Sequence, residues 1–185
     1  MALSFRLATP ADALHLTSLI NTSFRNDPTT DVFLSPSHEG IDVTSLPEME
    51  AIISDPSKTT ILATVPNPSD AAEKMVGHCS VRLLDDKNKP SMAWFGMLAV
   101  DISSQGQGVG SQLLKYAEWY ARTELKATRM EFDVVWTRKG LIDWYKSMGY
   151  SETGETRAFP YDRHAGWESV LRGDLGFLLM EKELV

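Results

Sequence analysis

A glycine-rich loop in the middle of the chain constrains the fold more than any other feature. Three glycines fall within five residues there: Gly106, Gly108 and Gly110. An apolar segment over residues 91–100 precedes them, and an amphipathic segment follows. Glycine adopts positive φ readily and has no Cβ to block a ligand that approaches the backbone. A strand, this loop, a helix and a further strand over residues 129–135 predict a βαβ unit whose two strands are parallel neighbours.

The same loop predicts a ligand that carries phosphate. Successive backbone N–H groups at the start of a helix, with the positive end of the helix dipole behind them, suit a pyrophosphate. A nucleoside triphosphatase loop would need Gly-Lys-Ser/Thr, and this loop has no lysine. The dinucleotide fingerprint would need a third glycine where Ser111 stands, which argues against a nicotinamide-dependent oxidoreductase. The remaining alternative is a helix start that turns tightly and binds nothing.

The segments before the loop read as antiparallel strands. Three β-rich stretches separated by turn-forming residues cover residues 59–65, 74–84 and 91–100. Consecutive strands joined by turns predict a meander. Residues 9–12, Thr-Pro-Ala-Asp, have the pattern of a capped helix start. Threonine caps, proline suits the first turn, and an acidic residue three positions after the threonine completes a capping box.

The remaining elements follow from hydrophobic periodicity and from the glycines and prolines at their ends. They are a strand over residues 4–8, a short helix over 48–54, a helix over 138–148, and strands over 150–157 and 176–184. Residues 26–47 are expected to be irregular, because prolines and a glycine interrupt them. The fold class is therefore α/β, a mixed sheet with helices packed on it. We expect a single domain over residues 1–185, since this length supports one sizeable core.

Charge and apolar content exclude several classes of protein. The net charge is −7, and an acidic surface repels the phosphate backbone, so nucleic acid is not expected as a partner. Such a surface attracts a cationic amine, although solubility explains the charge at least as well. No apolar run approaches the roughly twenty residues that span a bilayer, so no membrane partner is expected. The N-terminus lacks the apolar core of a signal peptide. Cys79 is the lone cysteine, so it can form no internal disulfide, and it is expected to be buried. A reducing, cytoplasmic location is therefore expected.

Two motifs resemble the GNAT superfamily of N-acetyltransferases. Gln105, Gly108 and Gly110 match that family's Gln/Arg-x-x-Gly-x-Gly/Ala loop, and Leu98 and Val100 precede it with the family's spacing. The segment over residues 144–150, Trp-Tyr-Lys-Ser-Met-Gly-Tyr, is similar to the family's closing Tyr-x-x-x-Gly-Phe/Tyr. The resemblance implies a mixed, mostly antiparallel central sheet with flanking helices. In such a sheet the strand before the loop splays from its parallel neighbour.

The resemblance also implies a cosubstrate, acetyl-CoA, and the residues that bind it. They are the strand end and the loop: Leu98, Ala99, Val100, Gln105, Gly106, Gln107, Gly108, Val109, Gly110 and Ser111. Tyr145 stands where the family has its usual tyrosine, which implies an acid that protonates the leaving thiolate or a hydrogen-bond donor to it. Some relatives place a glutamate base twelve positions before that tyrosine, where this chain has Asp133. A core aromatic and a salt-bridged acid are the structural alternatives for these two residues.

One position departs from the family pattern. Many relatives have an asparagine that contacts the cofactor seven residues before the tyrosine, and this chain has Arg138 there. The asparagine's role is therefore not transferred to it. Arg138 is expected either to reach the phosphates of the cofactor or to lie on the surface. No cluster of residues has the spacing of metal ligands, so no metal is expected.

The resulting hypothesis is an acetyl-CoA-dependent N-acetyltransferase. It would transfer an acetyl group, by direct attack, to the primary amine of a small-molecule or amino acid-like acceptor. Acetylation of a protein N-terminus or lysine is the alternative within the same chemistry. A non-catalytic acyl-CoA-binding module is the alternative from another class. The protein is expected to act as a monomer or a homodimer.

Overall fold

The computed structural model describes residues 3–25, 32, 42–67, 73–163 and 171–185. Its strands are β1 (Ser4–Leu7), β2 (Thr59–Pro66), β3 (Glu73–Leu83), β4 (Met92–Val100), β5 (Arg129–Val135), β6 (Ser151–Ala158) and β7 (Gly176–Glu183). The α-helices in these ranges are α1 (Ala13–Arg25), α2 (Leu46–Ser54), α3 (Val109–Thr123) and α4 (Lys139–Ser147). None of them is long and apolar enough to cross a bilayer.

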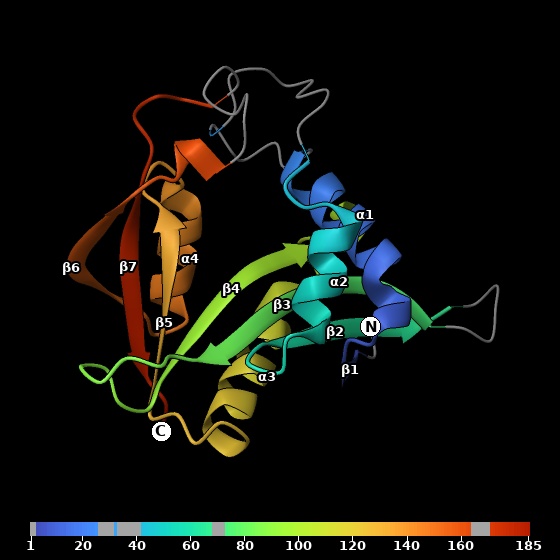
Figure 1. Ribbon diagram of the computed structural model, residues 1–185, viewed down its shortest axis with the longest axis horizontal. Coiled ribbons are helices and arrows are strands. Elements are labelled where there is room, and N and C mark those ends of the chain that lie inside the picture. The colour runs from blue at the N-terminus through green and yellow to red at the C-terminus, as the bar shows by residue number, and fades with distance from the viewer. Residues whose placement is uncertain (1–2, 26–31, 33–41, 68–72, 164–170) are drawn as a thin grey trace.

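The strands form one seven-stranded sheet in the order β1-β2-β3-β4-β5-β7-β6 (Figure 1). Strands β4 and β5 are parallel, and every other neighbouring pair is antiparallel. The predicted meander is β2-β3-β4, and the predicted βαβ unit is β4-α3-β5. The α/β class and the mixed, mostly antiparallel sheet are thus confirmed.

Helices cover both faces of the sheet (Figure 1). Ile61 and Ala63 on β2 belong to the larger buried cluster, which includes Leu113 and Leu114 on α3. Leu62, between them, belongs to a second cluster with residues of α1 and α2. Successive side chains of a strand point to opposite faces. One face of the sheet therefore packs on α3 and the other on α1 and α2.

Strands β4 and β5 separate after a short parallel contact. Only residues Met92 to Trp94 of β4 pair with β5. The pairing of β4 with β3 also shifts register just beyond, where Met97 adopts a φ of 53°. A bulge of this kind bends its strand. Beyond Trp94, no strand in the described part of the chain pairs with the edge of β4 that faces β5. The splayed parallel pair is therefore confirmed.

The boundaries of α2 correct the prediction at its N-terminus. The helix begins at Leu46, two residues before the expected start. The Ser45 side chain accepts a hydrogen bond from the backbone N–H of Glu48, and the Glu48 carboxylate accepts one from the N–H of Ser45. Pro47 lies in the first turn, where its missing N–H costs nothing. Residues 26–31 and 33–41 of the expected irregular segment lie outside the described residues.

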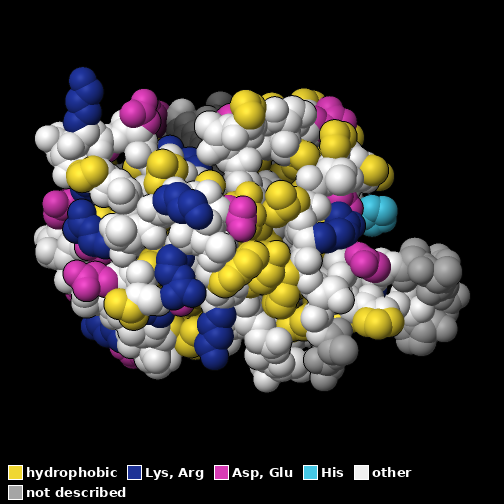
Figure 2. Space-filling view, turned by 90° about the horizontal axis from the view of Figure 1, so that it is seen from below, with side chains coloured by type: hydrophobic (Ala, Val, Ile, Leu, Met, Phe, Trp, Pro, Cys, Tyr) yellow, Lys and Arg dark blue, Asp and Glu magenta, His cyan; other side chains and the backbone are white. Residues whose placement is uncertain are grey.

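The net charge of −7 does not produce one acidic surface over the face that Figure 2 shows. Lys and Arg side chains are prominent there beside scattered Asp and Glu, and an apolar strip lies in the middle of the face.

Adjacent residues His78 and Cys79 on β3 are both fully buried, on opposite faces of the sheet. Cys79 belongs to the cluster beneath α3, whereas His78 pairs across the strands with Leu62 on the other face. Burial raises the pKa of the Cys79 thiol and lowers the pKa of His78 to about 3. The histidine and the thiol face apart, which excludes a catalytic pair between them.

His78 is expected to make the protein sensitive to acid. In the unfolded chain it binds a proton below its ordinary pKa of 6.5, but in the folded chain only below about 3. The free energy of unfolding should therefore fall by about 1.4 kcal/mol per pH unit below 6.5, or about 2 kcal/mol at pH 5. Urea denaturation at pH 5, 6, 7 and 8 measures this slope. His78→Leu should remove it, and His15→Leu, at an exposed position of α1, should not. An unchanged slope in His78→Leu would contradict the assignment.

Candidate active site

A cavity of about 700 Å³ opens between the end of β4, the start of α3 and α4. Its lining residues are Leu98, Val100, Ser104, Gln105, Gly106, Gly108, Val109, Gly110, Ser111, Arg138, Gly140, Leu141, Trp144 and Tyr145. Both motifs found in the sequence therefore contribute to one cavity. Ala99, Gln107 and Asp133 do not line it, although we considered all three as site residues.

The backbone of the glycine loop is open toward this cavity. Gly106 has a φ of 72° and Gly108 a φ of 81°. Residues other than glycine rarely adopt such positive φ values. A Cβ at Gly106 would have no atom within 4 Å, and one at Gly108 would lie 3.9 Å from the Gln112 side chain. Gly108 caps α3, so the free N–H groups of the first helical turn follow it directly.

The two glutamines of the loop hold its shape. The Gln107 side-chain amide donates to the Ser103 carbonyl at 2.9 Å. The Gln105 amide donates to the Val100 carbonyl at 3.3 Å. Both side chains therefore hold the loop backbone, and of the two only Gln105 also lines the cavity.

Side chains at the end of β4 point alternately to the two faces of the sheet. Leu98 and Val100 line the cavity. Ala99, between them, is buried in the cluster formed with α1 and α2. The alternation of a strand dictates this division, so the Ala99 side chain faces the opposite side of the sheet.

Tyr145 lies at the inner wall of the cavity, on α4. Its side chain is 5% exposed, and its ring packs against Phe132 with centroids 4.2 Å apart and against Trp144 at 4.7 Å. Its hydroxyl forms no hydrogen bond within the described ranges. Burial raises the pKa of this phenol, and the nearby positive charge of Arg138 opposes that rise only in part. The phenol therefore stays protonated at neutral pH and is free to donate.

Asp133 lies on the other face of β5. Its neighbours Phe132 and Val134 pack in the cluster beneath α3 and α4, so the Asp133 carboxylate points away from the cavity side. Oδ2 accepts from Arg157 Nη1 at 2.9 Å. Oδ1 is buried and has no hydrogen-bond partner among the described residues. Tyr145 and Asp133 thus flank the separating strands from opposite faces.

Glu131 shares the face and the ion-pair network of Asp133. Its side chain is 1% exposed and contacts Lys89 Nζ at 2.6 Å and Arg157 Nη2 at 3.3 Å. Two basic groups neutralise this buried carboxylate, which is therefore structural. Arg157 bridges it to Asp133 and fixes the position of the Asp133 side chain.

Arg138 lines the cavity at the N-cap of α4, and its contact with the phosphates stays a prediction. Leu141 and Trp144 line the cavity from the same helix face, as expected for residues three apart. Sequence reasoning did not assign Ser104, Gly140, Leu141 or Trp144 to the site. The helical spacing from Arg138 to Tyr145 is the signal that could have identified the last two.

These residues fit acetyl-CoA. The open positive-φ glycines and the first turn of α3 suit a pyrophosphate, and the unpaired edge of β4 suits an extended amide-bearing arm. The apolar side chains of Leu98, Val100 and Leu141 suit the methylene groups of that arm, and Arg138 adds positive charge. Among the described residues, no three His, Cys, Asp or Glu side chains gather as metal ligands would.

Comparison with known proteins identifies the family. The sequence model of the acetyltransferase (GNAT) family matches residues 26–150, which is more than half of the chain. Among curated proteins, none matches.

Solved structures with the same fold include three that are named for the reaction or bound to its donor. A Salmonella typhimurium protein described as an acetyltransferase and solved with acetyl-CoA has a TM-score of 0.69 at 14% identity, covering 100% of this chain and 95% of that one. The ribosomal-protein-alanine N-acetyltransferase from Brucella melitensis has a TM-score of 0.68 at 19% identity, covering 98% and 99%. A spermidine N-acetyltransferase chimera that includes Vibrio cholerae sequence has a TM-score of 0.67 at 15% identity, covering 100% and 96%. The chain therefore belongs to the acetyltransferase (GNAT) family and is an N-acetyltransferase whose acetyl donor is acetyl-CoA.

Proposed function

We propose that this protein acetylates the primary amine of a small-molecule or amino acid-like acceptor by direct attack on the acetyl donor. The observation that carries the proposal is the placement of two proton-handling groups on opposite faces of the separating strands. Tyr145 faces the cavity that suits the donor. Asp133 faces the side away from it, with one carboxylate oxygen unpartnered.

The cavity residues bind and orient the donor. Bound acetyl-CoA supplies a thioester carbonyl that a neutral amine attacks. The N–H groups of residues 108–111 hold the pyrophosphate, and Arg138 lies close enough to the cavity to add a charged contact. Backbone N–H groups on the unpaired edge of β4 donate to the carbonyl oxygen, where negative charge develops during attack. A preorganised donor of this kind is worth about 3–4 kcal/mol in other acyl transfers.

Tyr145 acts as the acid that protonates the leaving thiolate. Burial raises its pKa, so the hydroxyl carries its proton throughout the neutral range. No group in the described part of the chain occupies that proton in a hydrogen bond. Packing of the ring between Phe132 and Trp144 fixes the direction of the hydroxyl.

Asp133 acts as the base for the acceptor ammonium. Arg157 holds Oδ2, which leaves Oδ1 to accept the ammonium proton directly or through a water molecule. A carboxylate is a weak base for an ammonium in water, but attack consumes the neutral amine as it forms. The second N–H proton leaves to water once the carbon–nitrogen bond has formed.

Asp133→Asn is expected to lower kcat/KM by about 100-fold at pH 7, because positioned acid–base groups contribute roughly 100- to 10,000-fold. The deficit should shrink above pH 9, where a growing fraction of the amine is already neutral. Steady-state thiol release at pH 6 to 10 measures both effects. Asp12→Asn is the matched control, since Asp12 also pairs with an arginine, Arg6, at 2.8 Å, but at the start of the chain. A deficit in Asp133→Asn that does not change with pH would contradict a role as base.

A thiol-release assay tests the function as a whole. The purified protein is given acetyl-CoA with amino acids, polyamines or peptides that carry a free N-terminus or a lysine. Amine-dependent release of thiol with the small acceptors supports the proposal, and release with peptides alone favours a protein acetyltransferase. Binding of acetyl-CoA without amine-dependent release across the panel would overturn the proposal and favour an acyl-CoA-binding module.

A further inference from the structure

Strand β3 presents an unusual row of polar side chains to the face that carries α1 and α2. His78, Ser80 and Arg82 alternate there with Cys79 and Val81, which pack beneath α3. A strand inside a sheet that helices cover on both faces is ordinarily apolar on both. Both ring nitrogens of His78 and the hydroxyl of Ser80 are buried without a hydrogen-bond partner among the described residues. Such groups are rare in folded proteins and require an explanation.

Arg82 differs from the other arginines whose contacts the structure describes. Arg6, Arg129 and Arg157 each bind at least one carboxylate. Arg82 is partly buried and lies 5.2 Å above the Trp94 ring, but it has no carboxylate partner within the described ranges. Stacking occupies the flat face of a guanidinium and leaves its N–H edge free to bind a carboxylate with two parallel hydrogen bonds.

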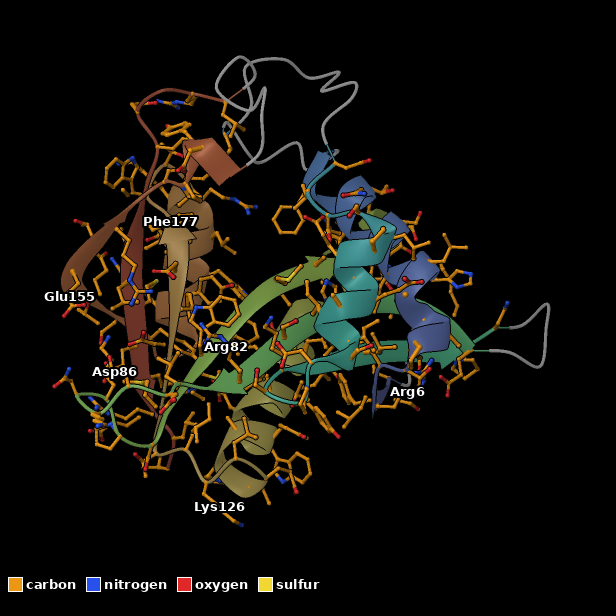
Figure 3. All side chains as sticks on the ribbon, in the orientation of Figure 1. Arg6, Arg82, Asp86, Lys126, Glu155 and Phe177 are labelled. Atoms are coloured by element: carbon orange, nitrogen blue, oxygen red, sulfur yellow. The ribbon has the colours of Figure 1, made fainter. Side chains whose placement is uncertain are left out.

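The position of Arg82 relates it to the transfer site. Arg82 is the cross-strand partner of Trp94, and Trp94 is the last residue of β4 that pairs with β5, at Glu131. The arginine therefore lies beside the point where β4 and β5 separate (Figure 3). The Trp94 ring extends along β4 over Gly96, where an added Cβ would lie 2.0 Å from it. Trp94 and Arg82 together form a flat cationic platform next to the splay.

Two carboxylates of β5 lie on the same face of the sheet as this platform, and Arg157 pairs with both of them. Trp94 and Glu131 are in register, so Glu131 and Asp133 share the face of Arg82. Neighbouring strands are about 4.8 Å apart, so the backbones of β3 and β5 lie roughly 10 Å apart at the row of Arg82 and Glu131. Strand β4, with the Trp94 side chain, lies between them.

We propose that Arg82 binds the carboxylate of an amino acid-like acceptor, with the Trp94 ring beneath it and the acceptor amine toward Asp133. The inference rests on the proposed function and adds the chemical class of the acceptor. The acceptor is a zwitterion whose carboxylate binds Arg82. Within the described ranges, Arg82 is the arginine on this face whose guanidinium has no carboxylate partner. An Arg82 that only packs on Trp94 would affect stability alone, and not the choice of acceptor.

The experiment compares each standard L-amino acid with its α-carboxamide, which keeps the amine and removes the negative charge. Thiol release with acetyl-CoA gives kcat/KM for both members of each pair. The protein is expected to prefer the acid, and Arg82→Gln to lose about 10- to 100-fold on the acid while keeping its activity on the amide. Arg82→Lys, which keeps the charge but not the planar fork, should fall between the two. Arg6→Gln, which removes an arginine from β1, is the control and should leave the preference unchanged.

Four results would overturn the inference. Equal use of acid and amide, or an unchanged preference in Arg82→Gln, would remove the carboxylate site but leave acetylation of amines in place. Equal losses of kcat/KM on acid and amide in Arg82→Gln, together with a lowered Tm, would show that Arg82 only packs on Trp94. If Arg82→Gln does not fold, the ratio of kcat/KM on acid and amide is measured in Arg82→Lys instead. Turnover of no amine of either kind, with acetyl-CoA bound, would overturn the proposed function itself.

Discussion

Gly108→Glu is expected to weaken acetyl-CoA binding by at least about 100-fold. Gly108 has a φ of 81°, a conformation that costs a residue with a side chain about 1–2 kcal/mol. The new carboxylate would also stand among the N–H groups that hold the pyrophosphate. Two like charges about 4 Å apart near a protein surface repel by about 4 kcal/mol. The repulsion alone exceeds the roughly 2.7 kcal/mol that corresponds to about 100-fold in affinity. The backbone strain is present with and without ligand, so it lowers the free energy of unfolding and not the affinity.

Isothermal titration calorimetry with acetyl-CoA measures this change. Gly154→Glu is the matched control, because Gly154 on β6 also has a positive φ, of 86°, and open space around its Cβ position. It carries the same strain and the same added charge, but it does not line the cavity. Full affinity in Gly154→Glu with loss in Gly108→Glu would locate the phosphate site at the loop. Full affinity in both variants would refute the loop as the site and leave it as a tight turn.

Tyr145→Phe is expected to lower kcat by about 100-fold or more while leaving the affinity for acetyl-CoA unchanged. The phenylalanine ring keeps the packing against Phe132 and Trp144. The lost hydroxyl has no hydrogen-bond partner in the described fold, so the free energy of unfolding should change little. The whole effect should therefore fall on the chemical step, where a positioned acid is worth roughly 100- to 10,000-fold.

Tyr150→Phe separates this effect from a general loss of structure. Tyr150 belongs to the same aromatic group, with its ring 6.1 Å from that of Tyr145, but its hydroxyl donates to Glu118 at 3.0 Å. Its removal should lower the free energy of unfolding by about 1–3 kcal/mol, because the Glu118 carboxylate loses a buried partner, and should leave kcat unchanged. Thiol-release kinetics and urea denaturation on both variants give the comparison. Full kcat in Tyr145→Phe would eliminate the tyrosine as the acid.

The elements of this fold could be predicted from short stretches of sequence. The glycine loop, the caps at residues 9–12 and the alternation along β2 and β5 each depend on neighbours within a few positions. Hydrophobic period and turn chemistry act at that range, so the strand and helix positions were predicted within a few residues. The early start of α2 was missed because Pro47 was interpreted as a helix breaker, although Ser45 and Glu48 form a capping box around it.

The loop residues that line the cavity could also be predicted from the sequence, because glycine spacing reports backbone shape. The residues that α4 contributes to the cavity could not be predicted in this way. Arg138 and Trp144 line the cavity only because α4 packs beside the start of α3. The opposite placement of Tyr145 and Asp133 requires the pairing of β5 with β7, as well as the alternation of β5 itself.

The sequence by itself determined the βαβ unit, its glycine-rich loop and the family, since these depend on local backbone geometry and on motif spacing. Only the tertiary structure decided which charged groups are paired. Arg157 neutralises Glu131 and Asp133 from a strand that lies 24 or more positions away in the chain. Arg82 meets Trp94 without a carboxylate partner in the described ranges. Electrostatic partners are set by distance in space, and long-range strand pairing brings together groups whose separation along the chain carries no such information.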